Sequence, residues 1–188
     1  MRRATLLAVL LLAGCGGSKA PPLVGVALDP PVHAPNFSLE DQSGGRVSVA
    51  EQRGHWLVVT FLYTQCPDVC PLIAAQLNRA IGTKAGRQAR LHVIAVSVDP
   101  ARDTLAAVRR YAVTHRLVPV FRWGIGSRAQ LARVWRAYHV AAQPGPRGTV
   151  THSTVEILID PQGNERLLYD ATIKASQLAG DLERLGAA

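Results

Sequence analysis

Two long apolar runs with a helical pattern between them constrain the fold of this chain most strongly. Residues 57–62 and 91–98 are nearly continuous in apolar and β-branched side chains, as expected of strands buried on both faces of a sheet. Between them, apolar residues recur at helical spacing over residues 72–81, and Gly82 ends the pattern. A strand, a helix and a second strand therefore form the centre of the domain.

Further elements extend this arrangement along the chain. The sequence predicts a hairpin over residues 37–49, a short strand over 120–123, and a strand with a returning partner over 153–169. Helices are expected over residues 103–115, 127–138 and 173–185. The pattern predicts an α/β protein with a central mixed β-sheet flanked by helices and an N-terminal β-hairpin. Trp123, Trp135 and Tyr138 are expected in its core.

The first fifteen residues have the pattern of an export signal. Two arginines precede an apolar stretch over residues 4–14, which has signal-peptide length but is too short to span a bilayer of about 30 Å. Residues 12–15 (LAGC) resemble the bacterial lipobox, and cleavage there would leave a lipidated Cys15. An ordinary secretory signal with a chance cysteine is the alternative.

This leader implies a domain organisation and a location. We expect residues 1–14 to be a lipoprotein signal peptide, residues 15–34 a lipidated tether rich in Gly, Ser and Pro, and residues 35–188 one domain. Acyl chains on Cys15 would anchor the exported protein to a membrane, facing the periplasm or the cell exterior.

The charge of the chain bears on its partners. The formal net charge is +8, and the basic residues are scattered and not interleaved with aromatic residues. An exported, anchored protein has little access to nucleic acid, so we expect no nucleic-acid partner. The charge is explained equally by docking to an acidic protein or anionic membrane, or by a solvated surface without a special role.

Cys66 and Cys70 are the only cysteines outside the leader. An exported protein is in a compartment that permits disulfides. A disulfide between residues four apart closes a very small loop and constrains the unfolded chain little. Stabilisation of the fold by a disulfide is therefore a poor explanation for the pair. Disulfide exchange, binding of a soft metal, or both remain as its chemistry.

The residues around the two cysteines predict their local geometry. If Asp68 caps the following helix, Pro71 falls at its third position, where no intrahelical donor is needed. Cys66 would then lie in the loop and Cys70 in the first helical turn, near a positive helix end that favours thiolate. The Asp68 carboxylate opposes that charge, and a bound cation would relieve the conflict.

The order of elements is also that of the thioredoxin fold. Residues 66–71 (CPDVCP), with 97–104 (SVDPARDT), 137–140 (AYHV) and 151–153 (THS), resemble the Sco/SenC family of copper chaperones for cytochrome oxidase assembly. The resemblance covers about residues 34–185 in order and with the expected spacing. Within it, Asp99, Arg102 and Asp103 are interpreted as a structural turn of caps and salt bridges.

The resemblance implies a copper site and a function. Cys66, Cys70 and His152 would hold one copper ion per chain, as Cu(I) and in a second state as Cu(II), because thiolates select Cu(I) and imidazole also suits copper. The family usually has an acidic residue before this histidine, where this chain has Thr151. The implied function is delivery of copper to the dinuclear copper centre of cytochrome c oxidase subunit II, with other periplasmic copper or thiol-redox proteins as further partners.

A second function uses the same cysteines without a metal. Cys66 and Cys70 could be the redox-active pair of a thiol-disulfide oxidoreductase that reduces the acceptor's cysteines. A peroxidase is a third and much less favoured function, because Cys70, as the resolving thiol, would lie unusually close to Cys66 in the sequence. His152 discriminates between the first two functions, since disulfide exchange needs only the cysteines whereas copper binding should need all three residues.

Overall fold

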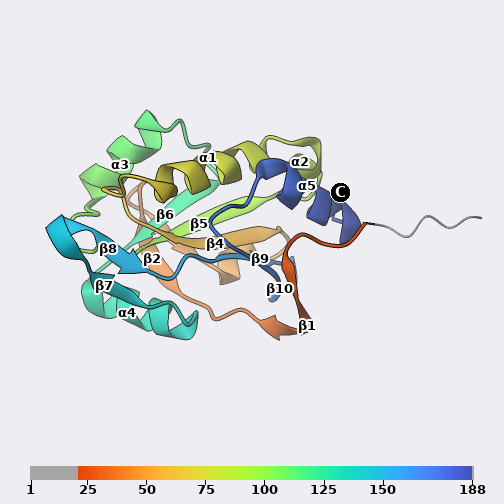
Figure 1. Ribbon diagram of the computed structural model, residues 1–188, viewed down its shortest axis with the longest axis horizontal. Coiled ribbons are helices and arrows are strands. Elements are labelled where there is room, and N and C mark those ends of the chain that lie inside the picture. The colour runs from red at the N-terminus through yellow and green to blue at the C-terminus, as the bar shows by residue number, and fades with distance from the viewer. Residues whose placement is uncertain (1–20, 188) are drawn as a thin grey trace, which may run out of the picture.

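The computed structural model describes residues 21–187 and has one eight-stranded sheet at its centre, in the order β1-β10-β9-β4-β5-β6-β2-β3 (Figure 1). A separate two-stranded ribbon pairs β7 with β8. The strands are β1 (Val26–His33), β2 (Ser38–Asp41), β3 (Arg46–Ser48), β4 (Leu57–Leu62), β5 (His92–Ser97), β6 (Phe121–Ile125), β7 (Ala142–Pro144), β8 (Val150–His152), β9 (Glu156–Ile159) and β10 (Asn164–Tyr169).

The two apolar runs form the middle of the main sheet, as predicted. β4 and β5 pair in parallel over their whole lengths, from Leu57 opposite His92 to Leu62 opposite Ser97. β6 continues the parallel part on one side, and β9 pairs antiparallel with β4 on the other. All six residues of β4 are buried, which explains its continuous apolar pattern. The predicted hairpin is also present, as β2 and β3.

Helices cover both faces of the sheet. α1, α3 and α5 lie on one face and α4 on the other (Figure 1). Trp135 of α4 donates its indole N–H to the Ser97 carbonyl at 3.0 Å, and the Tyr138 ring packs against Phe61 with centroids 5.8 Å apart. Trp123 is fully buried, so the three predicted core aromatics are confirmed. The helices are α1 (Val69–Ile81), α2 (Lys84–Gln88), α3 (Leu105–Thr114), α4 (Arg128–Ala137) and α5 (Ala175–Arg184), with short 3-10 turns at Ala50–Gln52 and Pro146–Gly148.

The structured chain begins earlier than the sequence predicts. β1 occupies part of the expected tether and pairs antiparallel with β10, from Val26 opposite Leu168 to His33 opposite Asn164. Its side chains are almost all exposed, and it contains two prolines, which are tolerated at a sheet edge. An exposed edge strand carries no apolar alternation, so the pattern did not reveal it.

Two further differences lie inside the domain. α2 follows α1 almost directly, because Gly82 caps the end of α1 and Thr83 caps the start of α2 by accepting the Gly86 N–H at 2.9 Å. The strand predicted from residue 153 begins only at Glu156, as β9, and a separate short strand that was not predicted, β8, ends at His152. His152 therefore lies on the small ribbon and not on a run into the main sheet.

Residues 1–20, which include the predicted signal peptide and Cys15, lie outside the described residues. Within residues 21–187, no helix is both long enough and apolar enough to cross a membrane.

Candidate metal centre

The two cysteines converge where β4 passes into α1. Cys66 is half-buried in the loop, and Cys70 is buried in the first turn of α1, with both thiols free. Asp68 occupies the cap position as predicted, although its side chain accepts no capping hydrogen bond. The Cys70 backbone N–H donates to the Cys66 sulfur at 3.3 Å. The helix start therefore brings both sulfurs to one place.

The pair is asymmetric in its ionisation. A hydrogen bond from the Cys70 thiol, supported by the backbone N–H groups of Asp68 and Cys70 and by the Tyr63 hydroxyl, lowers the pKa of Cys66 to about 5 against the effect of burial. The same hydrogen bond to Cys66, together with burial, raises the pKa of Cys70. Cys66 is therefore the thiolate at neutral pH, and Cys70 retains the proton that the pair shares.

Asp103 holds the cysteine loop against the sheet. Its buried carboxylate accepts from the Thr64 backbone N–H at 2.9 Å, from the Thr64 hydroxyl at 2.6 Å and from the Ser97 hydroxyl at 2.5 Å. Arg102 forms an ion pair with Asp99 in the same turn. The predicted structural turn is thus present, and it ties the loop after β4 to the end of β5.

His152 approaches from the other side, on β8, where it pairs with Ala142 of β7. Its Nδ1 lies 2.9 Å from the Ser153 carbonyl oxygen. A carbonyl can only accept, so Nδ1 carries the proton and the neutral ring keeps a lone pair on Nε2. The Ser153 carbonyl thus orients the imidazole.

The structure places His152 near the cysteines without bringing the three together as a closed site. The imidazole packs edge-to-face against Tyr63, with ring centroids 5.9 Å apart, and the Tyr63 hydroxyl reaches Cys66. Among the described residues, no three His, Cys, Asp or Glu side chains are close enough to hold a metal ion. Sequence reasoning missed Tyr63, because a tyrosine after a buried strand carries no signal of its own.

Two histidines stack on each other away from the cysteine pair. His55 and His92 stack with centroids 4.2 Å apart and planes 24° apart. An imidazole coordinates in the plane of its ring, so two stacked rings do not aim their lone pairs at one ion.

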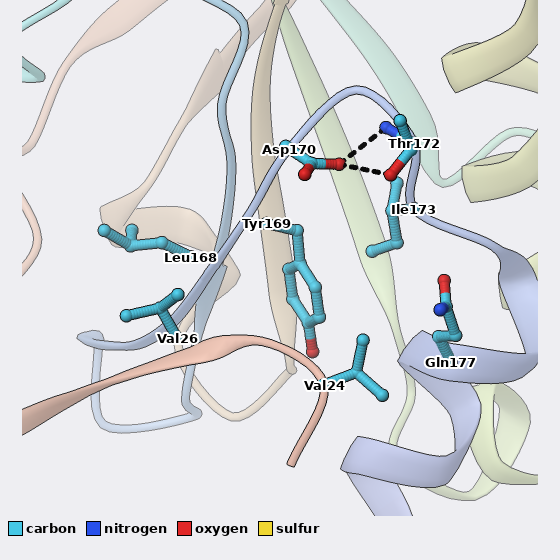
Figure 2. Close-up of a pocket in the computed structure, with 8 residues that line it drawn as sticks. All are labelled: Val24, Val26, Leu168, Tyr169, Asp170, Thr172, Ile173 and Gln177. Carbon is cyan, nitrogen blue, oxygen red and sulfur yellow. Dashed lines mark hydrogen bonds between the residues drawn. The ribbon is translucent and has the colours of Figure 1, made fainter.

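A pocket also lies between the start of the described chain, β10 and α5 (Figure 2). Its lining contains no cysteine or histidine, and its Asp170 carboxylate already accepts from the Thr172 N–H and hydroxyl at 2.8 and 2.5 Å. We assign no ligand to either feature.

Comparisons with known proteins agree with this fold and motif. The SCO1/SenC family model matches residues 27–187. The mitochondrial SCO2 homolog of Bos taurus is 32% identical over 157 residues, covering 79% of this chain and 58% of the relative. The chain thus spans less than two thirds of that relative's length.

Solved structures extend the likeness to three dimensions. Apo Sco1 from Thermus thermophilus is 31% identical with a TM-score of 0.73, covering 87% of this chain and 97% of that structure. Bradyrhizobium japonicum ScoI with copper bound is 30% identical with a TM-score of 0.67, covering 81% and 99%. The predicted thioredoxin-like fold is confirmed.

Proposed function

The chain belongs to the SCO1/SenC family, and from that premise we propose that it binds copper and acts in assembly of cytochrome c oxidase. The observation that carries the proposal is the Cys66–Cys70 pair, a thiolate and a thiol that share one proton at the start of α1. Soft sulfur ligands favour Cu(I) over the harder biological cations. Copper is bound in the solved relative from Bradyrhizobium japonicum, which supports this choice of metal.

His152 is the proposed third ligand for one copper ion per chain. Its Nε2 lone pair is available because Nδ1 donates to the Ser153 carbonyl. The imidazole lies on a two-stranded ribbon that is not part of the main sheet, so a small shift of β8 could bring it onto the metal. Cu(I) and Cu(II) are both suited to thiolate and imidazole donors.

Transfer to an acceptor follows from the unequal exposure of the two sulfurs. Cys66 is half-buried and Cys70 is buried, so an incoming ligand meets the Cys66 side of the site first. We propose the dinuclear copper centre of cytochrome c oxidase subunit II as the acceptor, reached by stepwise ligand exchange. Other periplasmic copper or thiol-redox proteins would act before or beside this step.

The proposed location follows from the leader. We propose that residues 1–14 direct export, that a lipidated Cys15 anchors the protein on the outer side of a membrane, and that the following residues form a tether. Because β1 begins at Val26, the tether is shorter than the predicted 15–34, leaving about ten residues between lipid and fold. Such a tether keeps the copper site close to membrane-bound acceptors.

A thiol-disulfide oxidoreductase is the second candidate function, and the ionisation of the pair supports it. The Cys66 thiolate would attack an acceptor disulfide and form a mixed disulfide, releasing one acceptor thiolate. Cys70 would then lose its proton and displace the second acceptor thiolate, leaving a Cys66–Cys70 disulfide. The acceptor gains two electrons, and its thiols become free to bind copper.

Replacing His152 with alanine distinguishes the two functions. We expect His152→Ala to weaken Cu(I) affinity at least about tenfold, because a ligand is lost, while the Cys66–Cys70 disulfide still forms and is reduced as in the wild type. Affinity is measured anaerobically by competition with a chromophoric chelator, and disulfide formation by equilibration with glutathione.

His33→Ala is the matched control, because His33 is exposed on β1. Copper affinity unchanged in His152→Ala would contradict the three-ligand site. A wild-type protein that exchanges disulfides but takes up no copper would favour the oxidoreductase.

A further inference from the structure

Tyr63 contacts all three proposed copper ligands. It follows β4 directly, and its side chain is only 4% exposed. Its hydroxyl hydrogen-bonds with the Cys66 sulfur, and its backbone N–H donates to the Cys70 sulfur. Its ring meets the His152 imidazole edge-to-face, with the planes 85° apart. The structure brings these contacts together on one residue that the family motifs do not include.

The contacts of Tyr63 also cross between two parts of the fold. The cysteines lie on the loop and helix that follow β4, whereas His152 lies on β8, which pairs with β7 in a separate two-stranded sheet. The backbone N–H of Val150, on the same ribbon, donates to the Tyr63 hydroxyl oxygen. Tyr63 thus links the ribbon to the cysteine loop through both its hydroxyl and its ring.

We propose, on the basis of the proposed function, that Tyr63 is the positioning residue that joins the two halves of the copper site. Its ring holds the His152 imidazole against the same side chain that reaches Cys66, before the metal arrives. Its hydroxyl oxygen accepts from Val150, which leaves the hydroxyl hydrogen free to be donated to the Cys66 thiolate. The two roles belong to different atoms of one side chain and can be removed separately.

The hydroxyl has a spectroscopic consequence. A hydrogen bond to a thiolate lowers the energy of the filled sulfur orbitals, and hydrogen bonding around a cysteine sulfur is one of the means by which proteins tune copper sites. Loss of that hydrogen bond moves the thiolate-to-copper(II) charge-transfer absorption to longer wavelength. A residue that only fills space in the core would leave this absorption where it is.

The test uses three variants. Tyr63→Phe removes the hydroxyl and keeps the ring, whereas Tyr63→Leu removes both. Tyr138→Phe is the control, because Tyr138 is a second buried tyrosine whose hydroxyl donates to the Pro35 carbonyl at 2.6 Å instead of to the site. Each protein is examined without metal by NMR of the His152 ring protons, and with Cu(II) by absorption and by the rate of copper loss to a chelator.

We expect Tyr63→Phe to keep the wild-type His152 ring shifts, to shift the charge-transfer band to longer wavelength and to lose copper about tenfold faster. Tyr63→Leu should also move the His152 ring shifts toward those of a solvent-exposed histidine. Tyr138→Phe should match the wild type in every measurement.

Each contrary outcome has a distinct meaning. A wild-type protein that retains copper, with Tyr63→Phe indistinguishable from Tyr138→Phe, would overturn the role of the Tyr63 hydroxyl and leave the proposed function standing. Unchanged His152 shifts in a folded Tyr63→Leu protein would overturn the role of the ring; if that variant does not fold, the Tyr63→Phe comparison still tests the hydroxyl. A wild-type protein that retains no copper would overturn the proposed function and this inference with it.

Discussion

Replacing Cys70 with alanine is expected to move the ionisation of Cys66 from a pKa of about 5 toward about 8.5, the value of a free cysteine thiol. The reason is that the hydrogen bond from Cys70 is the largest of the effects that lower the pKa of Cys66. The backbone N–H groups and the Tyr63 hydroxyl remain and oppose part of the rise. The midpoint is measured from the ultraviolet absorbance of the thiolate and from the pH dependence of alkylation, in the metal-free reduced protein.

A serine at the same position provides the control. The hydroxyl of Cys70→Ser can still donate a hydrogen bond to Cys66, so its midpoint should lie between those of the wild type and Cys70→Ala. Both variants lack the second sulfur, and both should lose copper by more than the 10–100-fold typical of removing a residue that only supports a ligand. An unchanged midpoint in Cys70→Ala would mean that the helix start, and not the partner thiol, makes Cys66 a thiolate.

The cysteine geometry was predictable because it depends on neighbours in the sequence. A capping position at Asp68 and a proline at the third helical position together determine where the helix begins. Once that start is known, Cys66 lies in the loop and Cys70 in the first turn, as observed. The buried strands were predictable for a similar reason, since burial on both faces leaves a continuous apolar run.

The surroundings of His152 were not predictable in this way. The ribbon that carries it consists of two three-residue strands, too short for an alternating pattern to be recognised. Its contact with Tyr63 joins residues 89 positions apart in the sequence, and nothing in the local pattern around either residue indicates it. As ligands, Cys66, Cys70 and His152 remain a prediction, supported by the resemblance and by the free Nε2.

The early start of the fold depends on another long-range contact. The backbone N–H groups of Val24 and Gly25 donate to the Asp181 carboxylate at 2.9–3.0 Å, and Tyr169 donates to the same group. Asp181 lies on α5 and is fully buried. The sequence around Asp181 does not distinguish it from other acidic residues of a helix. The contact of Val24 and Gly25 with α5 was therefore not predictable from the sequence.

Neutralising Glu156 is expected to change how stability depends on pH. This carboxyl lies on β9 with 1% of its surface exposed; the Thr60 hydroxyl lies 3.4 Å from one oxygen, and the other oxygen has no partner within residues 21–187. Burial raises its pKa to about 8, with a small further rise from Asp170 and an opposing effect from Thr60. The folded protein therefore holds a proton on Glu156 at neutral pH, which the unfolded chain has released.

The sign of the effect follows from that difference. The folded pKa, about 8, is above the value of 4.5 that applies to the carboxyl in the unfolded chain. The free energy of unfolding should therefore fall as pH rises from about 4.5 to about 8, and the loss should be complete above that range. At about 1.4 kcal/mol per pKa unit, the total is about 3–5 kcal/mol. Glu156→Gln keeps the shape without the ionisation, so it should match the wild type at pH 4.5 and exceed it by about that amount at pH 8.

Urea unfolding of both proteins across this pH range measures the difference. Glu51→Gln, which removes an exposed carboxyl, controls for the change in net charge. Comparing Glu156→Gln with the wild type is needed because Cys66 acts in the opposite direction. Its lowered pKa makes the free energy of unfolding rise with pH over part of the same range. In the wild type, this rise therefore cancels part of the fall that Glu156 causes. Cys66 is common to both proteins and drops out of their difference. Parallel curves for Glu156→Gln and the wild type would therefore show that Glu156 ionises in the folded protein as readily as in the unfolded chain.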